Sequence, residues 1–103
     1  MPEAKDVVAE LAIFPLDQGE SVAPYVAKAV RVIEDSGLTY QLGPMATSIE
    51  GPWPEVWKVV DACFKALADE ADRLIVNFRA DFRKGREGRL QSKVESVRRE
   101  MAQ

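Results

Sequence analysis

The sequence predicts an α+β domain: a four-stranded antiparallel sheet covered on one face by two helices, with an extra helix at the C-terminus. Three observations lead to this fold class. The length of 103 residues suits a single domain over residues 1–103. Some segments alternate between apolar and polar residues, as strands do, and others repeat apolar residues at helical spacing. Their order is β-α-β-β-α-β, which right-handed crossovers fold into a ferredoxin-like sandwich.

Four segments alternate in the manner of strands and are bounded by turn-forming residues. These expected strands are residues 7–16, 38–42, 47–50 and 74–82. Three segments carry apolar residues on one helical face. These expected helices are a helix capped by Ser21 and Gly37, a helix from Trp53 to about Ala71, and a helix over about residues 89–101. Ser21 is a favourable N-cap, and Gly37 suits the left-handed residue that ends a helix.

The composition excludes several classes of function. The chain contains no histidine, so a Ser-His-acid site, a Cys-His site and a histidine-rich metal centre cannot be built. A net charge of −3 argues against nucleic acid as the main partner, because nucleic-acid-binding proteins carry a basic surface. Carboxylates alone can bind magnesium or calcium, but no EF-hand or phosphate-loop pattern is present. We therefore expect neither a metal site nor a catalytic cofactor.

The chain has a single cysteine, Cys63, which rules out an internal disulfide and favours a reducing compartment. Its position in an apolar helical stripe predicts a core residue. The start of the chain is polar and does not resemble a signal peptide, and no run approaches the roughly 20 apolar residues of a membrane span. We therefore expect a cytoplasmic protein that does not enter a membrane.

Two helices cover only one face of a four-stranded sheet, so the other face is expected to be open. The alternation places the following residues there: Val8, Glu10, Ala12, Phe14, Thr39, Gln41, Ile75, Asn77, Arg79 and Asp81. The strand at 47–50 adds either Ser48 and Glu50 or Thr47 and Ile49, and we prefer Ser48 and Glu50 because Ile49 suits the core. A face that is part apolar and part charged favours packing between the sheets of two subunits, with polar pockets at the edges. Its carboxylates outnumber its single arginine, which favours a cationic small ligand. In the alternative interpretation, Arg79 pairs with Glu10 or Asp81 only to neutralise charge within the interface.

Trp53 and Trp57, four positions apart at the start of a helix, have two interpretations. They can stack on a cationic ligand, or they can pack the helix onto its neighbours. Ser21 also has two interpretations. It can serve as the helix N-cap alone, or, if the N-terminus of that helix faces the pocket, its hydroxyl can also donate to a ligand atom.

Several stretches carry a family resemblance: FPLDQGESVAPYVAKAVRVIEDSGLTYQLGPMATSIEG at 14–51, W-x-E-V at 53–56, RADFRKG at 79–85 and KVESV at 93–97. They resemble the small thiamine-binding-protein family, long known only as an uncharacterised conserved family and related to the YkoF proteins that bind thiamine and its hydroxymethylpyrimidine half. The resemblance covers about residues 8–97, and PMATSIEG is its most specific element. The chain departs from the family pattern at Ala46, where glycine is common, and at residues 77–81, where a lysine-isoleucine-aspartate run is usual.

The resemblance implies a ferredoxin-like protomer that assembles through its sheets into dimers, often paired as tetramers, without known catalytic activity. It implies a pocket for thiamine or the pyrimidine near the sheet surface and the subunit interface. An aminopyrimidine needs hydrogen-bond acceptors and donors, for which Glu50, Ser48 and Asn77 are candidates. The thiazolium of thiamine would favour the acidic side chains Glu10 and Asp81. The expected ligand-binding residues are Glu10, Ser21, Pro44, Met45, Thr47, Ser48, Glu50, Asn77, Arg79 and Asp81.

The leading hypothesis is therefore a non-catalytic protein that binds thiamine or hydroxymethylpyrimidine near the interface between sheets and acts as a carrier, buffer or sensor. The alternative is a structural or regulatory homo-oligomer with no small-molecule ligand. A third possibility is a small enzyme that uses Glu50 and Asp81 as acid and base. The absence of histidine and of an activated nucleophile ranks the enzyme last.

Overall fold

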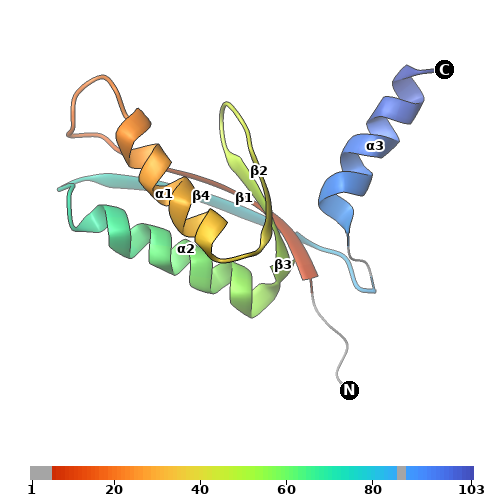
Figure 1. Cartoon of the computed structure of the whole chain (residues 1–103), viewed down its shortest axis with the longest axis horizontal. Coiled ribbons are helices and arrows are strands. Elements are labelled where there is room, and N and C mark those ends of the chain that lie inside the picture. The colour runs from red at the N-terminus through yellow and green to blue at the C-terminus, as the bar shows by residue number, and fades with distance from the viewer. Residues whose placement is uncertain (1–5, 86–87) are drawn as a thin grey trace.

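The structure, a computed structural model, describes residues 6–85 and 88–103 and has the predicted β-α-β-β-α-β order followed by a helix (Figure 1). The strands are β1 (Asp6–Pro15), β2 (Thr39–Leu42), β3 (Thr47–Pro52) and β4 (Leu74–Phe82). The helices are α1 (Ala23–Asp35), α2 (Trp53–Ala68) and α3 (Arg89–Met101). The predicted α+β fold class is confirmed.

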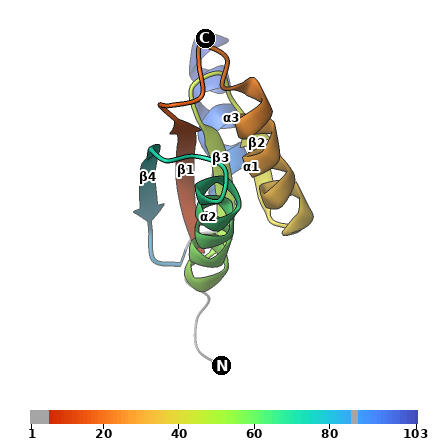
Figure 2. The ribbon, with the colours of Figure 1, turned by 90° about the vertical axis from the view of Figure 1, so that its left-hand side faces the viewer.

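The four strands form one antiparallel sheet in the order β2-β3-β1-β4. Helices α1 and α2 pack against each other and lie on the same side of the sheet (Figure 2). This is the ferredoxin-like arrangement. It leaves the opposite face of the sheet without α1 or α2.

The core lies between the sheet and these two helices. On β1 the alternation is strict, and the residues that point into the core are Val7, Ala9, Leu11 and Ile13. One face of α2 supplies a second set of buried residues: Val56, Val59, Val60, Cys63 and Leu67. Cys63 is fully buried, as predicted, and burial raises the pKa of its thiol to about 11. Such a thiol is uncharged at neutral pH and therefore unreactive.

The strand register confirms which residues share the open face. Residues opposite one another on neighbouring antiparallel strands point to the same side of the sheet. Their rows across the open face are Thr39, Glu50, Val8 and Asp81; Gln41, Ser48, Glu10 and Arg79; Ala12 and Asn77; and Phe14 and Ile75. Ser48 and Glu50 lie on this face while Ile49 lies in the core, as predicted.

Some predicted boundaries differ from those observed. Helix α1 begins at Ala23 with Val22 in the N-cap position, so Ser21 lies outside the helix, and no side chain caps it. A proline in the first turn already fixes a helical φ and removes one N–H that would need a partner, which explains how the helix starts without a cap. Helix α2 ends at Ala68, short of its predicted end, and β3 continues to Pro52.

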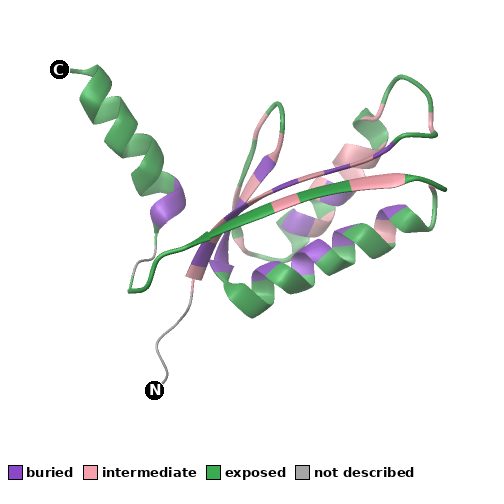
Figure 3. Ribbon diagram, turned by 180° about the vertical axis from the view of Figure 1, so that it is seen from behind, coloured by how far each residue is buried: buried purple, intermediate pink, exposed green. Residues whose placement is uncertain are grey.

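Helix α3 projects from one end of the domain and does not join the layer formed by α1 and α2 (Figure 1). Only its first turn is buried, at Arg89 and Leu90, and Figure 3 shows the remainder exposed. Of the apolar residues that predicted this helix, all those after Leu90 are exposed too: Val94, Val97 and Met101. A single copy of the chain therefore leaves the apolar stripe of α3 uncovered.

Candidate ligand-binding site

Glu50 lies where β3 meets α3 and is buried, with 9% of its surface exposed. Its Oε2 atom accepts hydrogen bonds from the backbone N–H of Arg89, at 2.5 Å, and of Leu90, at 3.3 Å. N–H groups at a helix start have no partner inside the helix, and a carboxylate there also suits the helix dipole. Glu50 therefore attaches α3 to the sheet. The sequence predicted that this carboxylate would face a ligand, but its Oε2 atom is bonded to the start of the helix.

Asp81 of β4 binds the same helix. Its Oδ2 atom accepts hydrogen bonds from the guanidinium of Arg89 and from Nζ of Lys93, the latter at 3.1 Å. The bond from Arg89, followed by that from Lys93, holds the pKa of Asp81 below its usual range. Asp81 therefore stays ionised near neutral pH and does not suit the general-acid role that the enzyme hypothesis requires.

Glu10 forms an ion pair with Arg79 on the neighbouring strand, with 3.2 Å between Oε1 and Nη2. The arginine is largely exposed, so the pair contributes little to stability. Within the described residues, the open face thus balances its carboxylates with cations: Glu10, Glu50 and Asp81 against Arg79, Arg89 and Lys93. The sequence predicted an excess of negative charge on the open face, and these residues show no such excess. Two of the three cations, Arg89 and Lys93, belong to α3, and the prediction counted only residues of the strands.

A polar groove of about 430 Å³ lies over this part of the sheet. Its lining residues come from β1, β3, β4 and α3: Val8, Ala9, Glu10, Ser48, Arg79, Ala80, Asp81 and Lys93. A second hollow, of about 360 Å³, shares Glu10 and Arg79 with the groove and extends it towards Ala12, Ala46 and Asn77. Both are broad and open to solvent.

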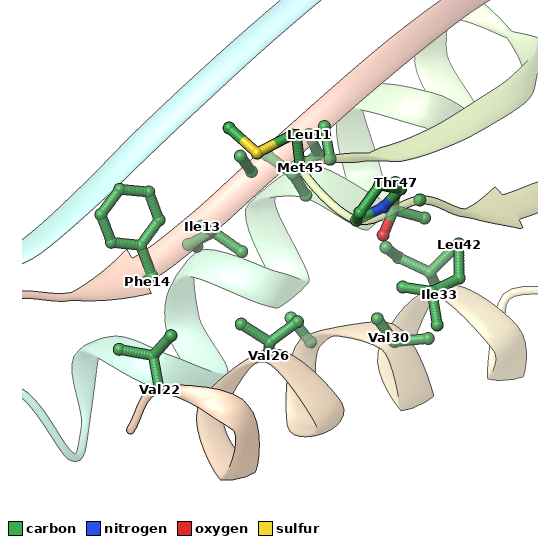
Figure 4. Close-up of a pocket in the computed structure, with 15 residues that line it drawn as sticks. Leu11, Ile13, Phe14, Val22, Val26, Val30, Ile33, Leu42, Met45 and Thr47 are labelled. Carbon is green, nitrogen blue, oxygen red and sulfur yellow. The ribbon is translucent and has the colours of Figure 1, made fainter. Parts of the chain in front are cut away.

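A third cavity, of about 170 Å³, lies between β1, α1 and the loop that joins β2 to β3 (Figure 4). Its walls are mostly aliphatic, with Leu11 and Val26 facing each other across it, and the loop residues 43–46 form its lip. Thr47 is buried and supplies the side-chain hydroxyl of the lining. Met45 on the lip is 87% exposed.

The ladder between β1 and β3 ends where these cavities meet. Strand β3 starts at Thr47, so residues 12–14 of β1 pair with β4 on one side and with no strand of the described chain on the other. Ala12 and Ala46 line both the aliphatic cavity and the adjoining polar hollow. We call this opening, bounded by residues 12–14 and 43–46, the notch. It brings the backbone N–H and C=O groups of a free strand edge to the mouth of an apolar cavity.

The structure divides the predicted ligand-binding residues into separate groups. Those that line the polar groove are Glu10, Ser48, Arg79 and Asp81. Those that line the aliphatic cavity are Pro44, Met45 and Thr47. Asn77 lies in the adjoining hollow, and Glu50 holds α3. Ser21 is exposed before α1 and lines none of these three cavities.

Three residues of the site were missed by sequence reasoning: Arg89, Lys93 and Ala12. Arg89 and Lys93 are four positions apart and share a helical face, which is a visible signal for joint binding of a carboxylate. The sequence pattern of α3 does not indicate which end of the sheet the helix meets. The carboxylate that binds these two cations, that of Asp81, was therefore not identifiable from the sequence. The role of Ala12 depends on where a neighbouring strand ends, which the residue itself does not encode.

Trp53 and Trp57 follow the packing interpretation. Their rings stack with centroids 6.0 Å apart, and the centroid of Phe78 lies 6.3 Å from that of Trp53 and 5.8 Å from that of Trp57. Phe78 is opposite Leu11 and so points to the helix side of the sheet. The tryptophans therefore lie on the side away from the polar groove.

The fold and the cavities define a small ferredoxin-like protein with ligand-sized openings beside a strand edge. Within residues 6–85 and 88–103, no helix is long and apolar enough to cross a membrane, and no cluster of three or more acidic or cysteine side chains is placed to hold a metal ion. Residues 9–98 match the thiamine-binding protein family, and the chain belongs to that family. Membership indicates a small-molecule-binding role and confirms the resemblance seen in the motifs.

Relatives match along most of the chain. The UPF0045 protein Mb1933 of Mycobacterium bovis is 38% identical over 94 residues, which is 90% of this chain and 92% of the relative. The UPF0045 protein MJ1052 of Methanocaldococcus jannaschii is 31% identical over 93 residues, 90% of this chain and 93% of the relative. The crystal structure of MJ1052 matches with a TM-score of 0.84 at 32% identity, covering 89% of this chain and 95% of that one. TM0486 of Thermotoga maritima, whose name assigns it to thiamine biosynthesis or salvage, matches with a TM-score of 0.80 at 22% identity, over 89% of this chain and 98% of that one, and supports the fold alone.

Proposed function

We propose that this protein binds thiamine or its hydroxymethylpyrimidine half, with the pyrimidine ring seated in the notch. The observation that carries the proposal is the end of the β1–β3 ladder at Thr47, which leaves one edge of β1 free beside an apolar cavity. Family membership supports the class of ligand.

The notch offers what a flat aminopyrimidine requires. The faces of the ring are apolar and pack against aliphatic side chains such as Leu11 and Val26. The edge of the ring carries an amine donor beside a nitrogen acceptor, and a free strand edge presents C=O and N–H groups that ordinarily serve a neighbouring strand. Residues 12–14 supply these groups, and Thr47 adds a hydroxyl. The backbone then takes the recognition role that the sequence predicted for Glu50.

The thiazolium half of thiamine would extend from the notch into the adjoining polar hollow, which contains Glu10 and Asn77. The partner of Glu10 is Arg79, and an exposed ion pair of this kind opens at little cost. A cationic ring can therefore replace the arginine beside the carboxylate. Hydroxymethylpyrimidine carries no such charge and does not need Glu10, so this side chain is expected to separate the two ligands.

We further propose that binding is the whole activity and that the protein serves as a cytoplasmic carrier, buffer or sensor without a catalytic cofactor. The arrangement of the carboxylates supports this proposal. Glu50 is bonded to the start of α3, and Asp81 is bonded to Arg89 and Lys93. Neither is placed for proton transfer to a substrate in the notch.

A second candidate function is a structural or regulatory homo-oligomer without a small-molecule ligand. Its supporting observation is uncovered apolar surface, namely the exposed stripe of Val94, Val97 and Met101 on α3 and the half-buried Phe14 and Ile75 on the open face. Two copies that pack through their sheet faces, as a dimer or within a tetramer, would cover such surface. This assembly is compatible with ligand binding, so it replaces the first proposal only if no ligand binds.

Calorimetric titration with thiamine and with hydroxymethylpyrimidine tests the proposed function. We expect micromolar binding of at least one compound by the wild type. Ala12→Leu places a larger side chain in the notch and is expected to weaken binding by about tenfold or more, a loss of about 1.4 kcal/mol. Ala62→Leu makes the same change at an exposed position of α2 and should leave binding unchanged. Equal affinity in the two variants, or no binding by the folded wild type, would contradict the proposal.

A further inference from the structure

Two cations of the polar groove are free to change partners. Asp81 is bonded both to the guanidinium of Arg89 and to Nζ of Lys93, although one cation is enough to neutralise it. The side chain of Lys93 is 52% exposed. Where the groove meets the adjoining hollow, Arg79 holds Glu10 through an exposed pair. Exposed ion pairs exchange partners at little cost, so Arg79 and Lys93 can both turn to a bound anion.

Arg89 has a different role from these two. Its side chain is only 11% exposed, and its guanidinium also donates to the backbone C=O of Asp81, at 3.2 Å. Its backbone N–H is held by Glu50. Arg89 therefore stays with Asp81 when Lys93 turns away, and the carboxylate of Asp81 remains compensated. An anion in the groove is then not repelled by an unpaired carboxylate at this end.

The hollow and the groove follow one another along the open face of the sheet. On β4, Asn77 lines the hollow, Arg79 lines both spaces and Asp81 lines the groove. Asp81 lies four positions beyond Asn77, a span of about 13 Å along the strand. Lys93 lies at the far end, where its Nζ reaches Asp81. A ligand that starts in the notch and lies along the strands passes Glu10 and then enters the groove.

Charge balance indicates what the far end of such a ligand carries. The carboxylates and cations of the open face named above balance one another in the described residues. A thiazolium that replaces Arg79 beside Glu10 adds one positive charge and leaves the arginine without a carboxylate. An arginine and a lysine that line one groove favour an anion between them. Phosphate suits both, because a guanidinium binds it bidentately and an ammonium binds it as a point charge.

We propose that the polar groove is a phosphate subsite and that the protein binds the phosphate monoester of thiamine more tightly than thiamine itself. This inference rests on the proposed seat of the pyrimidine in the notch. The hydroxyethyl arm of thiamine leaves the thiazolium on the side away from the pyrimidine, so in this pose it enters the groove. A phosphate on that arm lies between Arg79 and Lys93, with the hydroxyl of Ser48 as a further donor. Its charge of about −1.5 to −2 offsets the charge that the thiazolium adds.

Calorimetric titration of the full chain with thiamine and with thiamine monophosphate tests the subsite. We expect the wild type to bind the monophosphate about tenfold more tightly, and the preference to shrink at high salt, because exposed charges are screened. Lys93→Gln should lower the affinity for the monophosphate about fivefold more than the affinity for thiamine. Lys58→Gln, at an exposed position of α2, is the matched control and should leave the preference unchanged.

Arg79→Gln gives a second and more specific readout. The substitution removes a phosphate partner and also removes the cation that competes for Glu10. Binding of the monophosphate should therefore weaken while binding of thiamine strengthens. A purely structural role of Arg79 would weaken both. A preference for the monophosphate that survives in both Lys93→Gln and Arg79→Gln would place the phosphate outside the groove and overturn the proposal.

The wild type alone separates this inference from the proposed function. Thiamine binding without any gain for the monophosphate would overturn the phosphate subsite and leave the proposed function standing. Binding of neither compound by the folded protein would overturn both. Inorganic phosphate tests whether the anion must be carried by the ligand: we expect it to bind about 100-fold more weakly than the monophosphate, because it lacks the tethering rings. Equal binding of inorganic phosphate would overturn the assignment to a phosphorylated ligand.

Discussion

Glu50 of β3 and Arg89 of α3, 39 positions apart in the sequence, are joined by a hydrogen bond of 2.5 Å from the backbone N–H of Arg89 to Oε2 of Glu50. The bond couples the PMATSIEG motif to the C-terminal helix, and no pattern in the sequence connects these two features. A change at Glu50 therefore acts on α3 before it acts on any ligand. An effect of such a change on ligand binding is informative only when α3 is shown to remain in place.

Replacing Glu50 with alanine removes the acceptor at the start of α3. We expect the free energy of unfolding to fall by about 1–3 kcal/mol, because buried N–H groups lose their partner. Glu50→Gln keeps a side-chain oxygen and should lose less. Urea unfolding measures the change, and amide hydrogen exchange at Arg89 and Leu90 should accelerate in the alanine variant. Glu100→Ala, at an exposed position of α3, is the control. Full stability of Glu50→Ala would rule out the capping role.

Asp81 should make stability depend on acid pH. Its carboxylate is ionised in the folded state at a pKa held below the usual value by Arg89 and Lys93. The stabilisation is therefore present above the unfolded-state pKa of about 3.9 and is lost as the pH falls through the lower folded-state value. We expect Asp81→Asn to be less stable than the wild type at pH 7 and the difference to vanish towards about pH 2. Asp69→Asn, at an exposed position after α2, is the control. A difference that grows on acidification would contradict the assignment.

Cys63 should resist thiol reagents in the folded protein. Its thiol is buried and has a pKa of about 11, so little thiolate exists at neutral pH. We expect labelling at about pH 8 to be on the order of 100-fold slower in the folded protein than in denaturant. The denatured chain is the control, since its thiol regains an ordinary pKa. Rapid labelling of the folded protein would show that the core opens around α2.

Glu10→Gln should separate the two candidate ligands. The substitution removes the negative charge beside the proposed thiazolium position and leaves the notch unchanged. We expect thiamine affinity to fall by about five- to tenfold, or about 1 kcal/mol, with hydroxymethylpyrimidine affinity unaltered. Glu55→Gln, at an exposed position of α2, is the control. Equal losses for both compounds, or no loss for either, would place the thiazolium elsewhere.

Strand and helix order was predictable because alternation and helical spacing are local properties of the sequence. The strict alternation along β1 assigned Glu10 to the open face and Leu11 to the core, and the register agrees. The start of α1 was less predictable, since Ser21 has the chemistry of an N-cap but the helix begins after Val22. At this position the N-cap signal of Ser21 competes with Pro24, which allows the helix to start without a side-chain cap.

The candidate site was only partly predictable, because it depends on how distant elements meet. Glu50 was placed on the correct face of β3, but its partner is the start of a helix whose direction the pattern does not encode. The notch exists because β3 begins at Thr47, opposite Leu11, while β1 continues to Pro15. How far one strand extends beyond its neighbour depends on how the two strands pair in the folded protein. The residue pattern of either strand alone does not reveal it.

The most direct test of the central claim is an amide NMR titration of the full chain with hydroxymethylpyrimidine. We expect the largest shift changes at residues 12–14 and at Gly43, Met45, Ala46 and Thr47, which border the notch. Changes confined to the polar groove around Ser48 and Lys93, or no changes at saturating ligand in the folded protein, would contradict the claim that the notch holds the pyrimidine ring.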